Sequence, residues 1–465
     1  MKILLIDPSK EEATTRKKRG ITKFPQISLR YLAGLTPADH EVRILEEEVE
    51  PIDFGADCDL VGITCMTANS TRAYEVADKF RRMGKQVVFG GVHPTVRPEE
   101  AGRHADAVVV GEAEPVWEKI LQDAHTHSLA PIYRSGTEWS LDDYALPRRD
   151  PGPSGAILGI VPVVTSRGCP YACDFCCVRN VFGRKIRHVS VARVMEDIER
   201  SGASRVMFLD DNIVGDQAYA EKLFDALKTT GIQWVGQASV SFVRNERLLE
   251  KASASGCRGL FVGLESVSEK KIQRMQKSMK TLEDTASAIR RITQSGILFH
   301  ASIVFGFDDD DTSIFDQTLQ FLMDTRISSA TFNILTPYPG TEVYDRFKAE
   351  GRLFTEDWSS YDHCTPTFVP KLMSVDELID GYNRVKRTFL SLTSIAARLP
   401  ANWRTPLLYL VANLGQRMVF HKEQGTGWAG FPQTVLSTAG SVAASAGSVA
   451  GSVYGRVRST FWPQP

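Results

Sequence analysis

The first 125 or so residues alternate between short apolar runs and polar or amphipathic segments. The apolar runs are continuous: KILLID, EVRILEE, DLVGITCMT, KQVVFGGVHPT and ADAVVVGEAE. A helical pattern, TRAYEVADKFRRMG, lies between the third run and the fourth. Continuous apolar strands are typical of a parallel α/β sheet whose two faces are both covered by helices. Each run ends in small or polar residues, so we expect a ligand cleft at the carboxyl ends of these strands.

A second set of apolar runs begins after a polar stretch rich in proline and glycine. The runs are VPVVTSRG, SRVMFLDDN, IQWVGQASV, GLFVGLES, LFHASIVFG and SATFNILTP, with helical segments such as VARVMEDIERSG between them. Strands that alternate with helices predict a (β/α) barrel, and a complete barrel has eight such units. The sequence shows six, so it predicts a partial (β/α)6 TIM barrel.

The rest of the chain is mainly helical, and its clearest amphipathic run is MSVDELIDGYNRVKRTFLSL with Ser374 as the N-cap. The last stretch, STAGSVAASAGSVAGSVYGRVRST, repeats small residues, which predicts a flexible tail. The predicted organisation of this α/β chain is a Rossmann-like domain over 1–143, a linker over 144–159, a partial barrel over 160–352, a helical accessory region over 353–425 and a low-complexity tail over 426–465.

Composition and charge exclude some classes of protein but identify no function. The 465 residues are 43% hydrophobic and 24% charged, as in ordinary globular proteins. Lysine and arginine total 55 against 56 acidic residues, so no net field points to nucleic acid, and we predict no nucleic-acid partner. No apolar run reaches 18 residues and the amino terminus lacks the pattern of a signal peptide, so we expect a cytoplasmic protein without a transmembrane segment.

Half of the eight cysteines fall in one short segment, and three of them, Cys169, Cys173 and Cys176, have the spacing C-x3-C-x2-C. Three thiolates leave one iron of a four-iron cluster open, whereas a structural cluster or zinc site takes four protein ligands. An open iron favours catalysis. Cys177 is too close to Cys176 to be a fourth ligand of the same cluster. A zinc knuckle with Cys177 or His188 as the fourth ligand is the alternative.

The motif CPYACDFC after the first barrel strand resembles the radical S-adenosylmethionine superfamily, and the resemblance covers roughly 161–347. It implies a [4Fe-4S] cluster on the three cysteines, S-adenosylmethionine that is cleaved to a 5'-deoxyadenosyl radical, and an electron donor such as flavodoxin or ferredoxin. It also implies S-adenosylmethionine contacts at the barrel mouth. The candidates are Phe175, Asp210, Asp211, Asn212, Gln237, Glu265, Ser266, Phe305 and Gly306.

Several of these residues have a purely structural alternative. Asp210 and Asp211 could cap the following turn, and the run of aspartates at 308–311 predicts a solvated loop that begins a helix. Glu265 directly follows an apolar strand, where a carboxylate is costly without a partner. A cofactor amine or ribose is a natural partner for it.

The segments GITCMTANS, GGVHPTVRPEEA and VVVGEAEPVW resemble the cobalamin-binding domain of the cobalamin-dependent branch of this superfamily, and PYPGTEVYDRF fits the same branch. Glycines would let a bulky cofactor approach the backbone, although they could equally be plain turns, and hydroxyls could bind its nucleotide tail. The candidate cobalamin contacts are Thr64, Thr67, Ser70, Gly90, Gly91 and Gly111.

One motif of other cobalamin proteins is absent. The pattern D-x-H-x-x-G, which supplies a histidine to cobalt, does not occur, because Asp7 is followed by Pro8, Ser9 and Lys10. We therefore predict bound cobalamin without a protein imidazole on cobalt. His93, in the sequence HPT, is interpreted as a loop anchor.

Together these features predict a cobalamin-dependent radical S-adenosylmethionine methyltransferase. It would use methylcobalamin to methylate an unactivated carbon of a small-molecule or lipid-like substrate. The alternatives are an oxidative cyclase or rearrangement enzyme of the anaerobic tetrapyrrole type and a non-catalytic cobalamin or redox sensor. A methylthiotransferase fits poorly, because only Cys58 and Cys65 are available for a cluster in the first domain. The apolar segment 405–420 either packs on the barrel or makes a peripheral membrane contact.

Overall fold

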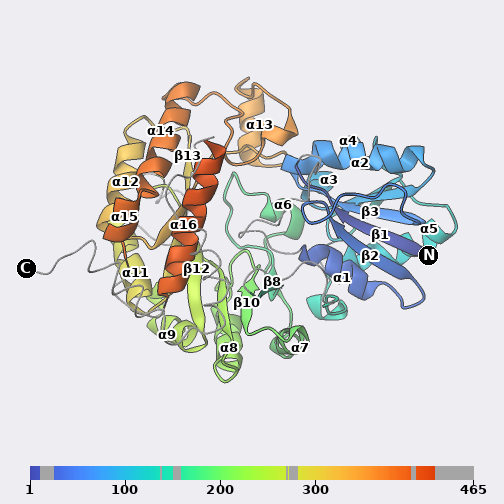
Figure 1. Cartoon of the computed structure of the whole chain (residues 1–465), viewed down its shortest axis with the longest axis horizontal. Helices are drawn as coiled ribbons and strands as arrows, with labels where there is room; N and C mark the ends of the chain where they lie inside the picture. The colour runs from blue at the N-terminus through green and yellow to red at the C-terminus, as the bar shows by residue number, and fades with distance from the viewer. Residues whose placement is uncertain are drawn as a thin grey trace, which may run out of the picture.

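Two parallel sheets, each of six strands, dominate the structure, which is a computed structural model. It describes residues 1–10, 26–136, 139–149, 159–268, 271, 281–399 and 405–424. Figure 1 shows the first sheet on the right, the second sheet with its helices on the left, and α6 and β8 between them. The predicted α/β fold class is confirmed.

The first sheet has the strand order β2-β1-β3-β4-β5-β6, and every pairing in it is parallel. Its strands are β1 (Lys2–Asp7), β2 (Glu41–Glu46), β3 (Leu60–Thr64), β4 (Gln86–Gly90), β5 (Ala107–Val110) and β6 (Ile132–Arg134). The apolar runs predict the first five of these strands but not β6, whose three residues are too few to form a recognisable run.

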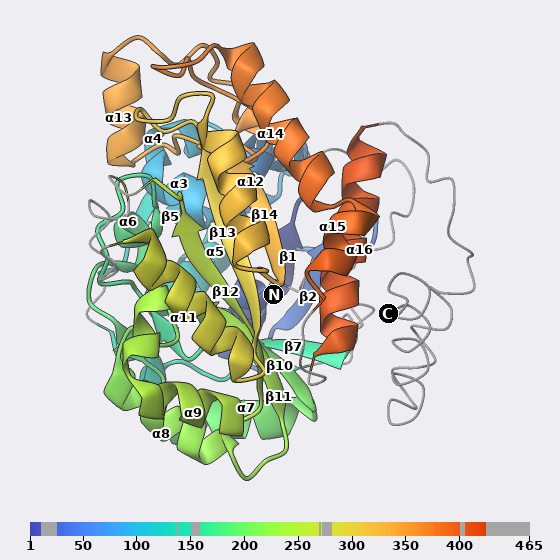
Figure 2. The ribbon, with the colours of Figure 1, turned by 90° about the vertical axis from the view of Figure 1, so that its left-hand side faces the viewer.

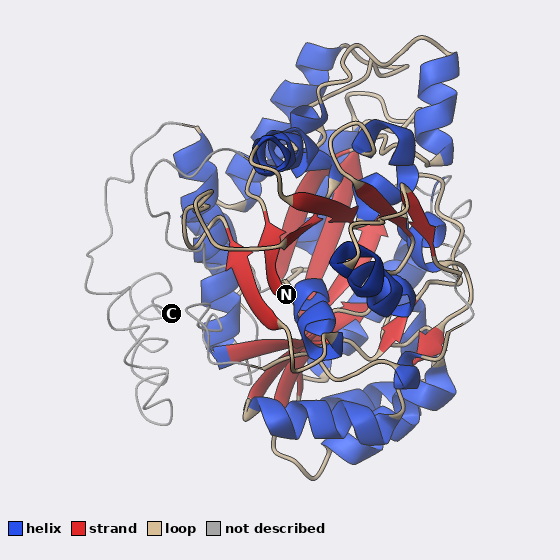
Figure 3. Ribbon diagram, turned by 90° about the vertical axis from the view of Figure 1, so that its right-hand side faces the viewer, coloured by secondary structure: helices blue, strands red, loops and turns tan. Residues whose placement is uncertain are grey.

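Helices cover both faces of this sheet (Figure 3). They are α1 (Ile27–Leu35), α2 (Ser70–Arg82), α3 (Val92–Val96), α4 (Pro98–Ala101) and α5 (Trp117–His125), with 3-10 turns η1 (Thr67–Asn69) and η2 (Glu114–Val116). One face packs on a cluster that contains Phe80 of α2, and the opposite face packs on a cluster that contains Trp117 of α5. The continuous apolar strands are explained by these two cores.

The second sheet has the order β14-β13-β12-β11-β10-β7, again all parallel. Its strands are β7 (Ile160–Val163), β10 (Arg205–Phe208), β11 (Gln233–Ala238), β12 (Cys257–Glu265), β13 (Leu298–Phe305) and β14 (Ser329–Ile334). A short antiparallel pair, β8 (Ser166–Arg167) and β9 (Arg187–His188), lies beside it. The six predicted strands of the partial barrel are therefore confirmed.

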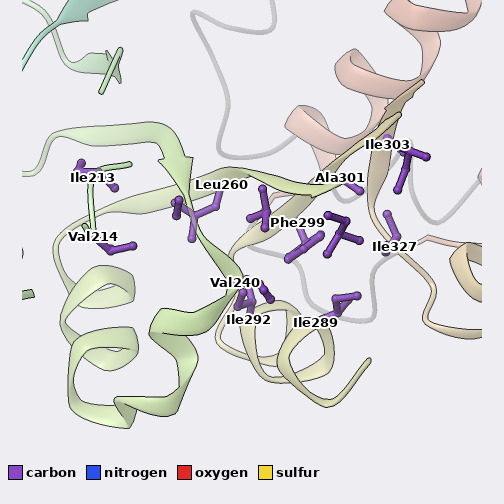
Figure 4. Packing of buried hydrophobic residues seen from close by; sticks show 14 of the residues in the cluster. Ile213, Val214, Val240, Leu260, Ile289, Ile292, Phe299, Ala301, Ile303 and Ile327 are labelled. Carbon is purple, nitrogen blue, oxygen red and sulfur yellow. The ribbon is translucent and has the colours of Figure 1, made fainter. Parts of the chain in front are cut away.

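Helices follow the strands and cover the outer face of this sheet. They are α7 (Val191–Ser201), α8 (Gln217–Leu227), α9 (Glu246–Ala254), α11 (Leu282–Gln294) and α12 (Ile314–Asp324), with the 3-10 turn η5 (Val240–Arg244). Figure 4 shows Phe299 and Ala301 of β13 packed towards Ile289 and Ile292 of α11. The core of this region thus lies between the sheet and its helices.

The segment after the barrel is helical, as predicted: α13 (Glu342–Ala349), η6 (Trp358–Ser360), α14 (Val375–Phe389), α15 (Leu392–Ala397) and α16 (Pro406–Glu423). Ser374 caps α14, because its hydroxyl accepts a hydrogen bond from the Glu377 N–H, in a capping box. Figure 2 shows α14, α15 and α16 gathered beside the barrel strands. The predicted tail lies outside the described residues, as does most of the predicted linker.

Helix α16 contains the apolar segment that suggested either barrel packing or membrane contact. Tyr409 is completely buried with Leu298 of β13, and Leu408 lies against Gly259 of β12. Leu407 and Val419 remain exposed. The helix therefore packs on its own barrel. No helix among the described residues is long and apolar enough to cross a membrane.

Candidate functional site

The three candidate cluster cysteines lie on the loop between β8 and α6 (Val178–Phe182). Each is half-buried, and none of them is in a disulfide. Gly168 begins the loop with φ +92°, and a side chain there would meet the carbonyl oxygen of Lys185 at 2.5 Å. Only glycine fits this turn, which directs the chain from β8 into the cysteine loop.

The donor set of this loop suits an iron–sulfur cluster. Burial raises the pKa of the Cys176 thiol to about 12, so a bound cation is needed to hold it as a thiolate. Among the described residues, no group of three His, Cys, Asp or Glu side chains converges on a single ion. A four-iron cluster does not need that, because each cysteine binds a different iron. Cys169, Cys173 and Cys176 are the residues that would hold it.

Two aspartates after β10, Asp210 and Asp211, bind the segment that leads into the cysteine loop. Asp210 is completely buried, and its Oδ1 accepts hydrogen bonds from the Thr165 N–H, Thr165 Oγ1 and Ser166 Oγ at 3.1, 2.8 and 2.6 Å. Asp211 is half-buried and accepts a hydrogen bond from the Gly168 backbone. Burial raises the pKa of both carboxyls to about 6. Oδ1 of Asp210 thus holds the segment before the cysteine loop, while its buried Oδ2 has no hydrogen-bond partner among the described residues. Asp211 holds the backbone at the start of the cysteine loop.

Asn212 and Gln237 lie at neighbouring strand ends. The side-chain oxygen of Asn212 accepts a hydrogen bond from the Ser239 N–H at 3.1 Å. The hydroxyls of Ser239 and Ser241 lie 3.4 and 3.3 Å from the hydroxyl of Tyr171, which belongs to the cysteine loop. Gln237 is exposed on the inner side of β11, where a cofactor can reach it. These contacts place the ends of β10 and β11 beside the cysteine loop.

Phe175 connects the same loop to the end of β13. Its ring packs against Phe307 with 5.7 Å between ring centroids. Phe305 differs, because its ring is completely buried between Phe315 and Phe332 on the helix side of the sheet. The predicted contact of Phe305 with S-adenosylmethionine could therefore involve only its backbone.

The aspartate run at 308–311 is only partly a solvated loop. Asp310 is buried, and its Oδ2 accepts hydrogen bonds from the backbone N–H groups of Gly306 and Phe307, both at 3.0 Å. Asp308 pairs with Arg352 at 2.7 Å. The predicted solvated loop was wrong for Asp310, because its carboxylate closes the turn that carries Gly306. Gly306 thus lies at the barrel mouth with its N–H already in use.

Glu265 has an unusual backbone. It is nearly buried at the end of β12, where the register with β13 shifts, and its φ is +64°. The Ser266 N–H donates to the Leu264 carbonyl at 2.8 Å, which makes a tight turn centred on Glu265. Non-glycine residues in this region carry backbone strain, and such strain clusters at functional sites. Glu265 and Ser266 therefore remain candidates for S-adenosylmethionine contacts.

The candidate cobalamin glycines lie along the carboxyl edge of the first sheet. Gly90 ends β4, and Gly91 has φ +109°, with the Cys65 carbonyl oxygen 2.7 Å from the place of a side chain. Gly111 follows β5, and its N–H donates to Thr95 Oγ1 at 3.1 Å. All three glycines are half-buried. The chain's own atoms exclude a side chain at Gly91 and Gly111, whereas nothing lies within 4 Å of that place at Gly90.

The three hydroxyl residues predicted to contact cobalamin differ in burial. Thr64 is half-buried at the end of β3. Thr67 and Ser70 are buried and use their hydroxyls internally, to His93 Nδ1 at 3.2 Å and to the Thr67 carbonyl at 2.9 Å. His93 is completely buried, with its other nitrogen 3.0 Å from the Tyr74 hydroxyl. His93 belongs to helix α3 and not to a loop, and its ring is held by internal hydrogen bonds. Thr64 is the candidate hydroxyl that is not buried.

A buried ionic network, which the sequence did not predict, joins this edge to the cysteine loop. Glu112, just after Gly111, pairs with Arg167 at 2.8 Å and with Arg187 at 2.7 Å, while Arg167 also pairs with Glu114. All four side chains are nearly buried. Glutamates directly after an apolar strand, in GEAEP, and an arginine directly before the glycine–cysteine pair were the available signal.

Two further contacts connect the first sheet to the segment after the barrel. The Trp358 indole N–H donates to Glu100 at 2.7 Å, and Lys10 pairs with Asp362 at 2.7 Å. With the ionic network, these contacts hold the carboxyl edge of the first sheet opposite the mouth of the partial barrel. The elements that carry the two sets of candidate cofactor residues therefore meet at one junction.

Comparison with protein families identifies both halves of this junction. The family described as "B12 binding domain" matches residues 22–121, and the family described as "Radical SAM superfamily" matches residues 163–322. The two segments together make up more than half of the chain. The chain belongs to the cobalamin-dependent radical S-adenosylmethionine enzymes. The cofactors of this radical enzyme are accordingly a [4Fe-4S] cluster, S-adenosylmethionine and cobalamin.

Characterised relatives include methyltransferases. Bacteriochlorophyllide d C-12(1)-methyltransferase from Chlorobaculum tepidum is 29% identical over 419 residues, which are 86% of this chain and 91% of the relative. Hopanoid C-2 methylase from Rhodopseudomonas palustris is 24% identical over 351 residues, 72% of this chain and 66% of the relative. The radical enzyme thus falls in a family of methyltransferases.

A solved structure has the same fold. The radical S-adenosylmethionine methyltransferase TsrM from Kitasatospora setae, solved with cobalamin and a [4Fe-4S] cluster bound, has a TM-score of 0.65 at 15% identity. The match covers 85% of this chain and 90% of TsrM. At this identity the likeness concerns the fold.

Proposed function

We propose that this radical enzyme transfers a methyl group to an unactivated carbon of a small-molecule or lipid-like substrate. The observation that carries the proposal is the junction itself, where the carboxyl edge of the first sheet faces the cysteine loop of the barrel. Arg167 and Glu112 join the two at 2.8 Å. When bound, S-adenosylmethionine on the cluster supplies a carbon-centred radical, and methylcobalamin supplies the methyl group. Both groups would act on one substrate in this junction.

The first sheet domain and the partial barrel would bind different cofactors. Residues 1–143 would hold cobalamin, mainly through Thr64, Gly90, Gly91 and Gly111, with no imidazole on cobalt, since His93 is buried in internal hydrogen bonds. Residues 160–352 would hold the cluster and S-adenosylmethionine. We assign the contacts to S-adenosylmethionine to the groups that the structure leaves at the barrel mouth: Phe175, Asp211, Asn212, Gln237, Glu265, Ser266 and the backbone of Gly306.

The other residues of the site position these groups. Gly168 allows the turn that leads into the cysteine loop, and Asp211 accepts its N–H. Arg346 of α13 pairs with Asp174 at 3.3 Å, which braces the loop from the opposite side. Reduction of the cluster would come from an external donor such as flavodoxin or ferredoxin.

The proposal is tested by isotope labelling. Cells that express the enzyme are fed [methyl-¹³C]methionine, and their extracts are compared by mass spectrometry with extracts of cells that express Cys176→Ala. A compound labelled only with the wild type identifies a methylated product. A compound that instead loses hydrogen and gains no label would replace methyl transfer by an oxidative cyclisation. A purified enzyme that binds cobalamin but forms no 5'-deoxyadenosine would point to a sensor.

A further inference from the structure

Two residues that the proposed function does not use, Tyr338 and His363, lie together at the barrel mouth. Tyr338 belongs to the loop between β14 and α13, in the sequence PYPGT. This loop and the start of α13 contact the cysteine loop and α6, which follows it. The Val343 N–H donates to the Asp174 carbonyl at 3.1 Å, and the Asn180 side chain donates to the Gly340 carbonyl. Tyr338 is therefore on the wall next to the predicted cluster.

The segment that carries His363 bridges the barrel and the first sheet. The His363 carbonyl accepts a hydrogen bond from the Ile334 N–H at the end of β14. The neighbouring Asp362 pairs with Lys10, three residues beyond the end of β1. Its other oxygen accepts from the N–H groups of Cys364 and Thr365 at 3.0 and 2.8 Å. His363 is thus held between the two sets of candidate cofactor residues.

The backbone of His363 is left-handed, with φ +67°. Among the described residues only His127, Glu265 and Arg326 share a positive φ without being glycine. The side chain of His363 is open to solvent on one side. The protein atoms around the rest of the ring make its charged form less favourable and so lower its pKa. The His363 imidazole is thus neutral, is held in place by its backbone contacts, and can be reached by a ligand.

The hydrogen bonds determine which ring nitrogen is available. The Tyr338 hydroxyl lies 3.0 Å from the Tyr361 carbonyl and 2.9 Å from His363 Nε2. A carbonyl only accepts, so the single hydroxyl proton of Tyr338 goes to Tyr361. His363 Nε2 must then carry the ring proton and donate it to Tyr338. Nδ1 is left as an acceptor, and no described residue donates a hydrogen bond to it.

The charges around the imidazole are already paired. Lys10 neutralises Asp362, and Lys386, whose Nζ is 3.0 Å from the Tyr382 hydroxyl, pairs with Glu423. That hydroxyl in turn donates to Cys364 at 3.4 Å. A ligand that enters here finds a neutral acceptor and no unpaired charge among these groups, which suits an uncharged polar group.

We propose that His363 binds the substrate, and that its Nδ1 accepts a hydrogen bond from an uncharged O–H or N–H group of the molecule to be methylated. The inference rests on the proposed methyl transfer in this junction. Tyr338 is a positioning residue, because it fixes the tautomer of the imidazole.

Chemical footprinting tests the state of the ring in the holoenzyme without any substrate. Diethyl pyrocarbonate modifies neutral, accessible imidazoles, and peptide mass spectrometry reports each site. His363 should be modified at a rate comparable with that of exposed His127, while completely buried His93 should not react. An unreactive His363 in a preparation where His127 reacts would overturn the proposal.

Variants test the role in binding. His363→Gly suits the left-handed backbone and removes the imidazole, and His127→Gly, at φ +53°, is the matched control. With the ¹³C-labelled product as the assayed compound, His363→Gly should raise the KM of its precursor about tenfold, the cost of one lost hydrogen bond. Formation of 5'-deoxyadenosine without substrate should stay at the wild-type rate, and free imidazole should restore part of the loss.

The outcomes are separable. Wild-type kinetics in His363→Gly would overturn the substrate contact even though methyl transfer stands. Equal loss of product and of uncoupled 5'-deoxyadenosine would show a structural role and also overturn it. Failure of the wild type to form any ¹³C-labelled product would refute the proposed function, and the footprint of His363 would still decide whether an accessible acceptor is present.

Discussion

The two six-stranded parallel sheets of this enzyme differ in how much of each face is covered by helices. In β1 of the first sheet, the consecutive residues Ile3, Leu4, Leu5 and Ile6 are all buried, because helices cover both faces. In β12 of the barrel, Phe261 is 38% exposed between two neighbours that are almost completely buried. Helices α7 to α12 cover the outer face of the barrel sheet, whereas on the inner face α16 covers Leu298 and Gly259 and leaves Phe261 partly exposed. The first sheet can offer a ligand its edge, whereas the barrel offers its edge and its inner face.

The inner face of the barrel also carries polar groups. His300 of β13 lies next to Phe261, and its two nitrogens lie 2.8 Å from the Ser329 hydroxyl and 2.7 Å from the Thr331 hydroxyl. Gln237, one strand further along, is exposed. Two sheets built from similar apolar runs thus differ: we expect the first to bind its cofactor at its edge, and the second also presents partly exposed side chains on its inner face.

The largest expected effect concerns the loop where the barrel edge meets the first sheet. Replacing Cys169, Cys173 or Cys176 by alanine should abolish both the iron–sulfur absorbance and all 5'-deoxyadenosine formation, because each thiolate holds one iron. Cobalamin binding should persist, since it belongs to the other sheet. Cys177→Ala is the control and should leave the absorbance largely intact. Equal damage from Cys177→Ala would overturn the ligand assignment.

The contrast between faces predicts different costs for two phenylalanines on neighbouring strands. Phe299→Ala, on the covered face of β13, should lower the free energy of unfolding by about 3–5 kcal/mol, the cost of a large core cavity. Phe261→Ala should cost less than about 1.5 kcal/mol, because much of that ring is already in contact with water. Urea denaturation of the purified variants measures both. Similar losses would show that the inner face is packed like the outer one.

The ionic network predicts that the two sheets depend on each other. Glu112→Gln should destabilise the protein by about 3 kcal/mol, since it leaves the nearly buried Arg187 and Arg167 short of a countercharge. Asp57→Asn removes the exposed partner of Lys2 and should cause no measurable change. Thermal denaturation followed by circular dichroism compares the two. A small effect of Glu112→Gln would show that the sheets are held together mainly by the other junction contacts.

An effect of similar size, confined to acid pH, is expected from the inner face. Burial lowers the pKa of His300 from its ordinary value of 6.5 to about 4. Between these two pH values the imidazole is protonated in the unfolded chain and neutral in the folded protein. The stability that neutral His300 contributes is complete above pH 6.5 and is lost as the pH falls towards 4. Wild type should therefore lose on the order of 3 kcal/mol more than His300→Gln between pH 7 and pH 4. Parallel pH profiles would show that His300 is protonated in the folded state.

Local signals in the sequence predicted most of the architecture. Apolar runs that end in small residues predicted eleven of the twelve strands of the two sheets, and only the three-residue β6 was missed. The capping box at Ser374 and Glu377 is also local, because both partners lie within one helical turn. The cysteine spacing likewise identified the chemistry of the barrel, since the three ligands come from a single loop.

The roles of several site residues depend on contacts between distant segments. The sequence could not show that Asp210 turns towards Thr165 and Ser166, or that the ring of Phe305 faces the helices, because alternation along a strand does not tell which face is covered. The same holds for Asp310, whose carboxylate closes its own turn instead of facing water.

The sequence by itself determined the order of the two α/β units, the cluster motif and the kinds of cofactor, because each of these depends on residues close together in the chain. Only the tertiary structure decided how the two units meet. Glu112 and Arg167 are 55 residues apart, and Glu100 and Trp358 are 258 apart. Tyr338 and His363 come together only because β14 and the segment after α13 share the barrel mouth. Pairings over such separations depend on the packing of whole elements, and no local pattern records them.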